Sequence, residues 1–325
     1  MVGNAPELPS ILGTSVPATN NTALRTTGFE LTLSWQDHLD NGLSYGVKFN
    51  LFDSRSKITK YPNNPTQALS NYIVGQYIGE IWGYKTIGIA KTDKEMQNHL
   101  ASLPNGGQDA IGSNWTAGDI MYKDLNHDGK ISSGAGTLSD HGDETIIGNN
   151  TPRYQFGLDL NVSWEGFDAT VFLQGVMKRD VWQGSDYLFG ASQNGVWRAF
   201  GITQVGDYFR DANTWSVQNG YEKENLDAYL PRPSYSIGNK NLQVQTRYLQ
   251  NAAYIRLKNL QIGYTIPSRI TNKLGIQVLR ISLSGENLWT GTKLASQFDP
   301  ETVTSSGGGT YPLSKTISCG LSVTF

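Results

Sequence analysis

The stretch RYQFGLDLNVSW, residues 153–164, alternates apolar and polar positions without exception. Its apolar set is Tyr154, Phe156, Leu158, Leu160, Val162 and Trp164. Because successive side chains of a β-strand point to opposite faces of the sheet, this period of two predicts a strand with one apolar and one polar face. FDATVFLQGVMK (167–178) repeats the pattern after the short turn at residues 165–166. The two runs therefore predict a hairpin.

The same alternation recurs on both sides of this hairpin. On the N-terminal side it spans residues 29–36 and 43–51, separated by the turn DHLDNG, which predicts a second hairpin. On the C-terminal side it spans 254–266, where the phase slips at Lys258, then 279–286, and finally TISCGLSVTF (316–325). Seven strands and an all-β fold class follow from these runs.

Alternation alone is equally typical of a soluble β-sandwich, but the connections favour a different fold. The connections within hairpins are short, at 165–166, 37–42 and 266–275, whereas those between hairpins are long, at 55–152, 179–251 and 290–313. Short turns at one end and long loops at the other are characteristic of bacterial outer-membrane barrels. The sequence thus predicts a transmembrane antiparallel β-barrel with these three segments as long extracellular loops.

Composition narrows the possible partners and sites. The 26 basic and 28 acidic residues leave a net charge of -2, and no Lys/Arg run appears, so nucleic acid is not an expected partner. The one cysteine, Cys319, excludes an internal disulfide and a cysteine-rich metal site. The N-terminal residues lack the pattern of a signal peptide. Seven strands cannot close a barrel in lipid, so we expect further strands upstream of this chain.

Eight ordered blocks, spread over roughly 300 of the 325 residues, resemble one known family. The blocks are LPSILGTSVPATN, TTGFELTLSW, GQYIGEIWGYKTIGI, GDIMYKDLNHDGKI, TIIGNNTPRYQFGLDL, WEGFDATVFLQG, YIRLKNLQIGYTIP and SLSGENLWT. They resemble the SusC/RagA group of TonB-dependent outer-membrane transporters found in Bacteroidetes.

The resemblance implies a complete barrel of about 22 strands, plugged by an N-terminal domain. Residues 1–325 would be the C-terminal part of that barrel, because nothing in the chain resembles the plug or the TonB-binding box. The family imports oligosaccharides or peptides with energy from TonB, and a SusD-like surface lipoprotein acts as a lid. Glycan import in the outer membrane is therefore the expected function. The alternative is a surface or secreted β-domain that binds carbohydrate or protein without transport.

The final strand and the histidines bear on assembly and catalysis. The alternating C-terminal strand ends on Phe325, which resembles the signal read by the barrel-assembly machinery. The four histidines, His38, His99, His127 and His141, fall in expected turns or loops, and no nucleophile motif accompanies them. The sequence therefore predicts that the chain is not an enzyme.

The motif DLNHDGKI (124–131) fits the first half of an EF-hand-like calcium loop. Side-chain oxygens at loop positions 1, 3 and 5 would come from Asp124, Asn126 and Asp128, Gly129 would allow the sharp turn, and Lys130 would offer its carbonyl. Position 12 is Ala135 and not an acid. The family that the chain resembles commonly has an acid just before TIIG, which here is Asp143 after an insertion of roughly eight residues, and Asp140 or Glu144 could also close the site. A metal-free polar turn is the alternative, and zinc between His127 and His141 is a weaker one.

Aromatic residues are dense in the loop 179–251. The candidates for contact with a ligand or partner are Trp182, Tyr187, Trp197 and Trp215, alongside Phe189, Tyr208 and Phe209. Flat rings can stack on sugars or pack against a protein, although the loop's own core is the commoner role. Aromatic residues near strand ends predict interfacial girdles: Trp35, Tyr45, Tyr154, Trp164 and Tyr264. The polar row of Arg153, Gln155, Asp159 and Asn161 would face the lumen and contact substrate or plug.

Overall fold

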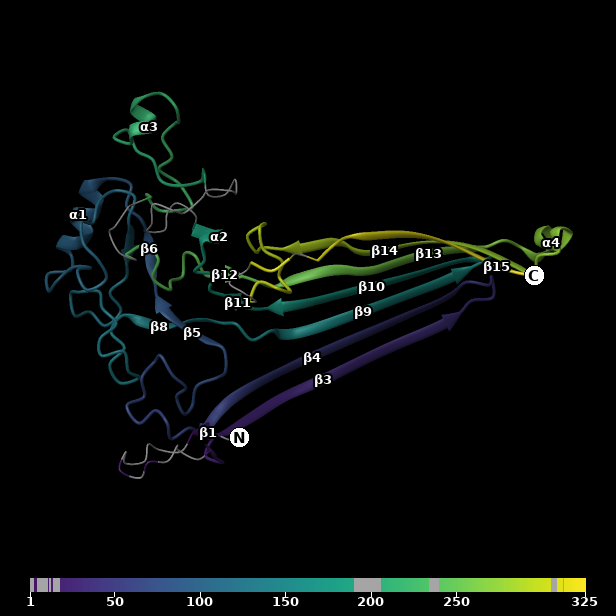
Figure 1. The fold of residues 1–325 in the computed structure, drawn as a ribbon, viewed down its shortest axis with the longest axis horizontal. Helices are drawn as coiled ribbons and strands as arrows, with labels where there is room; N and C mark the ends of the chain where they lie inside the picture. Colours follow the sequence, from purple (N-terminus) through teal and green to yellow (C-terminus); the bar gives the residue numbers. More distant parts are fainter. Residues whose placement is uncertain are drawn as a thin grey trace.

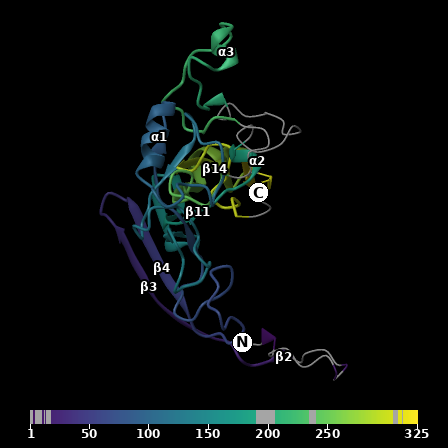
Figure 2. The ribbon, with the colours of Figure 1, turned by 90° about the vertical axis from the view of Figure 1, so that its left-hand side faces the viewer.

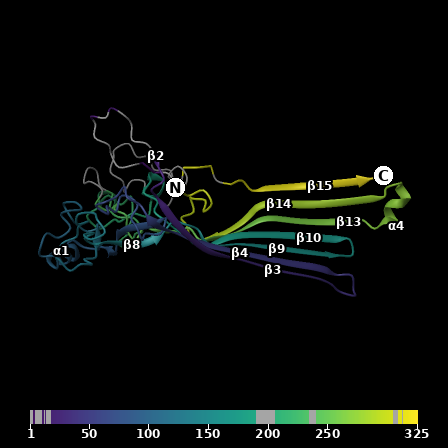
Figure 3. The same ribbon diagram turned by 90° about the horizontal axis from the view of Figure 1, so that it is seen from below.

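The computed structural model describes residues 3–4, 11, 13, 18–189, 206–233, 240–304, 309–311 and 313–325. Seven antiparallel strands form its main sheet, in the order β15-β14-β13-β10-β9-β4-β3 (Figure 1, Figure 3). Each strand of this sheet therefore lies beside the next strand of the same sheet along the chain. The strands are β3 (Ala23–His38), β4 (Ser44–Lys60), β9 (Arg153–Trp164), β10 (Phe167–Lys178), β13 (Tyr254–Thr265), β14 (Val278–Thr292) and β15 (Thr316–Thr324). All seven strands expected from alternation are present.

The register gives the sheet two chemically opposite faces. One row across the seven strands consists of Trp35, Val47, Leu160, Val171, Leu260, Gly285 and Ile317. The adjacent row, which points to the other side, consists of Gln36, Gly46, Asn161, Thr170, Gln261, Ser284 and Ser318. We call these two sides the apolar face and the polar face.

The apolar face is exposed in this chain. Trp35 is 63% exposed, Phe167 55% and Ile317 72%. In the described residues every other sheet has only two strands, and none packs over these side chains to form a sandwich. The sandwich alternative is therefore wrong, since a sandwich buries its apolar face against a second sheet.

Two strands extend beyond their apolar alternation. β4 continues to Lys60 and β14 to Thr292, so the long connections span 61–152, 179–253 and 293–315, and not the limits predicted from the sequence. The segment from Asp53 to Lys60 reads DSRSKITK and carries polar side chains toward both faces, which hides the period of two. It pairs with β3 nonetheless, up to Lys60 opposite Ala23.

The phase slip predicted at Lys258 is a β-bulge. The register of β13 shifts there against both β10 and β14, since Leu257 and Asn259 pair regularly on either side. One extra residue in a strand changes which side chains point to each face. The bulge places the Lys258 ammonium 3.1 Å from the Glu301 carboxylate, which also bonds Arg256 of the polar face.

The long connections gather at one end of the strands and the short turns at the other (Figure 1). The folded part of these connections, which we call the loop body, contains β5 (Glu80–Tyr84) paired with β8 (Glu144–Asn149), β6 (Thr86–Ile89) with β7 (Ile120–Tyr122), and β11 (Asp180–Val181) with β12 (Gln250–Asn251). Its helices are α1 (Asp93–Ala101), α2 (Asp186–Phe189) and α3 (Trp215–Gln218). At the short-turn end lie α4 (Ser268–Thr271) and η4 (Asn272–Leu274). Near the N-terminus, β1 (Gly3–Asn4) pairs with β2 (Ala18–Thr19) in a separate two-stranded sheet.

The hydrophobic core of the chain lies in the loop body and not in the sheet. Its fully buried members include Met96, Ile120, Tyr122, Phe209 and Tyr248, drawn from all parts of the loop body. α1 packs on this core through Met96, and its N-cap is Thr92, whose hydroxyl accepts the Glu95 N–H. No helix among the described residues is long and apolar enough to span a membrane.

Candidate functional site

The polar face carries an ion pair that spans three strands. Asp168 of β10 accepts hydrogen bonds from Arg280 of β14 across Gly263 of the intervening strand β13. A Cβ atom at Gly263 would collide with both side chains, so only glycine leaves the pair room to close. The polar face of the sheet is thus charged, and an ion pair links its strands β10 and β14.

A second charged cluster holds the last long connection against the same face. Arg256 of β13 donates to Thr290 Oγ1 (2.8 Å), Glu301 (2.7 Å) and Asp299 (2.8 Å). The guanidinium is 4% exposed and the Asp299 carboxylate 8%. Segment 293–304 therefore lies over the polar face, fixed by a buried arginine whose Nε, Nη1 and Nη2 each donate a hydrogen bond. The two cations of β13, Arg256 and Lys258, were the only sign of this cluster in the sequence. Nothing in the sequence indicated their acidic partners.

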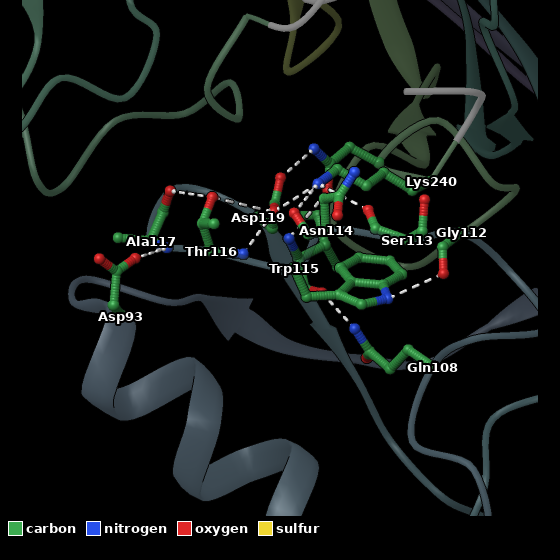
Figure 4. Close-up of polar contacts among 12 residues, drawn as sticks. Asp93, Gln108, Gly112, Ser113, Asn114, Trp115, Thr116, Ala117, Asp119 and Lys240 are labelled. Carbon is green, nitrogen blue, oxygen red and sulfur yellow. Dashed lines mark hydrogen bonds and ion pairs between the residues drawn. The ribbon is translucent and has the colours of Figure 1, made fainter. Parts of the chain in front are cut away.

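A buried lysine connects two distant parts of the loop body (Figure 4). The Lys240 ammonium donates to Asp119 Oδ2 (2.6 Å) and to the carbonyl of Asn114 (2.9 Å), and both charged side chains are 3% exposed. The ammonium also lies 5.1 Å from the centre of the Trp115 ring. Asn241 donates to Asp119 Oδ1 (2.8 Å). This cluster joins segments more than a hundred residues apart, and no sequence pattern indicated it.

The loop 124–131 folds as a chain of tight polar turns. Asp124 accepts the N–H groups of His127 (2.6 Å) and Gly129 (3.0 Å), and Asp128 accepts that of Lys130 (3.1 Å). Asn126 Oδ1 accepts the Asp128 N–H at 3.0 Å. Gly129 has φ +77°, as the sharp turn requires. Each carboxylate oxygen has a second lone pair, so these bonds leave acceptor capacity inside the loop.

Asp143 reaches this loop across the insertion. Its Oδ1 accepts the Leu125 N–H (2.7 Å) and its Oδ2 the Ser132 N–H (2.9 Å), and the residue is fully buried. Burial raises the pKa of the Asp143 carboxyl, these backbone hydrogen bonds lower it, and the nearby Asp124 charge raises it. Asp140, by contrast, bonds the Ala135 N–H at 3.1 Å. Of the three candidate acids, Asp143 is thus the one hydrogen-bonded to the 124–131 loop.

The donor set suits calcium only in part. Side-chain oxygens of Asp124, Asn126 and Asp128 together with the Lys130 carbonyl are the hard ligands that calcium prefers. Among the described residues, however, no three His, Cys, Asp or Glu side chains are grouped as a metal centre. A bound cation would have to draw on amide and carbonyl oxygens as well as on the carboxylates. The predicted metal ligands, Asp124, Asn126, Asp128, Lys130 and Asp143, therefore remain a prediction.

The aromatic candidates occupy different environments. Trp182 is partly buried and packs against the core, with its ring 5.9 Å from that of Phe189. Tyr187 is 51% exposed and Trp215 69%. Trp215 stacks on Tyr221, with ring centres 5.4 Å apart, in the segment around α3, which projects from the loop body (Figure 1, Figure 2). Trp197 lies outside the described residues.

Other expected residues lie as follows. Phe189 and Phe209 are fully buried, and Tyr208 donates to Glu222 at 2.9 Å. Trp35, Trp164 and Tyr154 are exposed near strand ends, and so is Trp289, which the sequence analysis did not single out. Phe325 is 80% exposed. His99 bonds Gln108 at 3.2 Å, and burial lowers its pKa.

Comparison with known proteins gives a consistent result. The TonB-dependent receptor P3 of Formosa agariphila is 24% identical over 98% of this chain and 30% of its own length. The receptor P39 of the same organism is 21% identical over 85% of the chain and 27% of its own length. No family model matches. The chain spans less than a third of the length of these curated relatives.

Solved structures show the same fold. The RagAB peptide transporter superposes with a TM-score of 0.66 at 21% identity, covering the whole chain and 32% of the transporter chain. The RagAB importer in its closed-closed state gives a TM-score of 0.65. The resemblance to SusC/RagA-type TonB-dependent transporters is thereby confirmed, and so is the all-β, antiparallel fold class; the described strands form an open sheet that matches part of such a barrel.

Proposed function

We propose that this chain forms part of an outer-membrane barrel that imports nutrients in a TonB-dependent manner. In this proposal the apolar face contacts lipid, the polar face lines the channel, and the loop body lies on the extracellular side. The observation that carries it is the two-faced sheet, whose apolar face has an exposed apolar side chain on each of the seven strands: Trp35, Val47, Val162, Phe167, Ile262, Leu283 and Ile317. Water would strongly disfavour so large an apolar surface, whereas lipid would not.

The edges of the sheet support the same proposal. Within the part of the chain that the structure describes, β3 and β15 each pair with a strand on one side only. Open edges are not tolerated in hydrocarbon, because their N–H and C=O groups have no partner there. Further strands of the whole protein would therefore complete the barrel. The plug and the contact with TonB would likewise belong to parts outside this chain.

Oligosaccharides are the proposed solute, and a SusD-like surface lipoprotein is the proposed partner at the loop body. Tyr187 and Trp215 are the described candidates with exposed rings suited to stacking on a sugar or contacting a partner. Peptides are the second candidate, because the structurally similar RagAB is named a peptide transporter. The similar proteins are receptors and transporters by name, which agrees with a non-enzymatic role.

The single natural cysteine offers a direct test of membrane placement. Cys319 pairs with Leu283 on the apolar face, and its neighbour Ser318 pairs with Ser284 on the polar face. A nitroxide spin label on Cys319 should collide with oxygen, which concentrates in lipid, and not with a water-soluble nickel chelate. The matched control is Ser318→Cys combined with Cys319→Ser, which should show the opposite preference. Equal access of the nickel chelate to both labels would contradict the proposal.

The solute is tested by uptake. Cells that lack the protein should lose uptake of labelled oligosaccharides but keep that of labelled peptides, and the wild-type gene should restore it. Loss of peptide uptake alone would replace the first solute class with the second. If neither uptake depended on the protein while purified protein still bound carbohydrate, the alternative of a surface binding domain would stand in place of transport.

We also propose that calcium stabilises the loop 124–131. The support is a turn rich in hard oxygen ligands, together with the buried Asp143 carboxylate beside the Asp124 charge, a repulsion that a divalent cation would relieve. Calcium should slow proteolysis of this loop relative to a chelator. The double variant Asp124→Asn, Asp128→Asn should abolish the difference, and Asp109→Asn, an exposed acid nearby, should preserve it. Protection by calcium in the double variant would refute the site.

A further inference from the structure

A small cationic cavity lies where β9 separates from β4. The two strands pair only as far as Phe52 opposite Gln155. Beyond that point segment 76–78 takes the place beside β4, with Ile58 N–H bonded to Gln76 O (2.9 Å) and Ile78 N–H to Ser56 O (2.9 Å). The change of neighbour opens a cavity of about 120 Å³ at the boundary between the sheet and the loop body.

Two of the cations that line this cavity have no carboxylate partner among the residues that the structure describes. Arg55 lies 3.9 Å from the centre of the Tyr77 ring, and within the described residues it makes no ion pair. The side chain of Lys178, at the end of β10, likewise makes no hydrogen bond or ion pair with any described residue. A cation stacked on an aromatic ring keeps its edge donors available for an anion.

The third cation is neutralised only in part. Arg153, which pairs in register with Lys178, donates through Nε and Nη2 to the Asp53 carboxylate, so its Nη1 is not engaged by that carboxylate. Lys57 lies against the Tyr77 ring at 5.7 Å and adds positive charge. Asp180, which does not line the cavity, accepts the Asn149 N–H at 3.1 Å. The described lining holds three cations, Arg55, Arg153 and Lys178, and no carboxylate, so the cavity has an excess of positive charge.

Donors and shape point to one ligand chemistry. The Ser54 hydroxyl also lines the cavity, beside Arg55. Guanidinium and ammonium groups that converge with a hydroxyl on a small space match the oxygens of a single oxyanion. We propose that this cavity binds a carboxylate, sulfate or phosphate group of a solute. Arg153 and Lys178 pair in register, in line with the polar-face residues Asn161 and Thr170, which places these two cations on the side where a solute would pass.

This inference does not depend on the proposed import, because anion binding can be measured on purified protein. Protein extracted from outer membranes in detergent would be titrated calorimetrically with inorganic sulfate, inorganic phosphate and acetate at low ionic strength. We expect binding of at least one of these anions. The double variant Arg55→Gln, Lys178→Gln should weaken that binding roughly a hundredfold, because each charge-assisted contact is worth about a factor of ten or more.

The matched control removes the same charge beside the cavity. Arg25→Gln combined with Lys60→Gln alters exposed residues of β3 and β4 that do not line it, and should leave the affinity within about threefold of wild type. An equal loss in both double variants would show a general charge effect and overturn the site, and so would absence of binding for all three anions. Binding only to micelles that contain phosphatidic acid would overturn the solute as the source and indicate a lipid headgroup.

Discussion

The stability of the loop body should be most sensitive to substitution of its buried charged residues. Lys240→Met removes the ammonium but leaves the Asp119 carboxylate 3% exposed and short of one donor. Breaking a buried pair from one side costs about 3–5 kcal/mol, because the remaining charge is desolvated without compensation. We expect a loss of that order in the unfolding free energy of the loop body, measured by denaturant titration of its tryptophan fluorescence. Lys94→Met, on the exposed side of α1, is the control and should change it by less than about 0.5 kcal/mol.

Titration of Asp143 should give the loop 124–131 an unusual pH dependence. Burial raises the pKa of this carboxyl in the folded chain. An acid whose folded pKa lies above its unfolded value stabilises the fold below the unfolded value, and this contribution is lost as pH rises through the folded pKa. Without calcium, hydrogen-exchange protection of the Leu125 and Ser132 amides should therefore fall as pH rises from about 4 toward 7.

Glu222 provides the opposite case within the same protein. A hydrogen bond from Ser216, foremost, holds the pKa of Glu222 below its ordinary value, so protection of the segment around α3 should fall as pH decreases. Opposite trends in the two segments would separate site-specific titration from a general acid effect. Parallel trends, or a loop 124–131 that becomes more protected at neutral pH without calcium, would contradict the assignment to Asp143.

The roles of individual residues in the structure could be predicted from the sequence to different extents. Asp143 was one of three candidate closing acids, favoured because the family that the chain resembles commonly has an acid just before TIIG, and it bonds the Leu125 and Ser132 N–H groups. Lys240 and Asp119 could not be paired, since a contact across 121 residues leaves no local pattern. Trp289 escaped notice for a related reason: it lies beyond the run 279–286 whose alternation identified β14.

Strands were more predictable than loops because their signal is local. The period of two located every strand of the main sheet, and a break in that period located the bulge at Lys258. The signal disappeared where β4 becomes polar on both faces. The loop body lacked such a signal altogether, because its short strands and helices are held by contacts between all three long connections.

Segment 293–304 is the element whose attachment can be tested most directly. Arg256→Gln would remove the charge that faces Asp299 and Glu301, leaving the nearly buried Asp299 carboxylate without a cation. At a cost of about 3 kcal/mol, the segment should open on the order of a hundred times more often. Limited proteolysis followed by mass spectrometry would measure this as faster cleavage within 293–304.

Two further variants serve as controls for Arg256→Gln. Lys258→Met removes a more exposed contact to Glu301 and should accelerate cleavage less than Arg256→Gln does. Lys315 lines a surface pocket together with Arg256 and Asp299 but makes no ion pair within the described residues, so Lys315→Gln should have no effect. Unchanged cleavage in Arg256→Gln would mean that the segment is held by its backbone and not by the arginine.

At the scale of the whole molecule, the lengths of the connections between strands were the strongest sequence signal after alternation. Three short and three long connections predicted that the two ends of the sheet would differ, and the long ones indeed gather at one end (Figure 1). What the sequence could not reveal is that the three long connections share one core. The sheet therefore has no core of its own, and its stability in isolation depends on what covers the apolar face.

That dependence leads to a prediction for the last residue. Phe325 is 80% exposed at the short-turn end of the sheet, and it follows the pairing of Thr324 with Val278. Its removal should change the stability of the folded protein in detergent by less than about 0.5 kcal/mol. If the barrel-assembly machinery reads this terminal aromatic residue, deletion of Phe325 should nevertheless reduce the amount found in the outer membrane several-fold, measured by quantitative immunoblotting of membrane fractions. Phe325→Tyr should restore that amount, whereas Ile317→Ala, an equally exposed apolar change on the same strand, should leave it unaltered. Normal amounts after deletion would show that the final strand is recognised through its alternation alone.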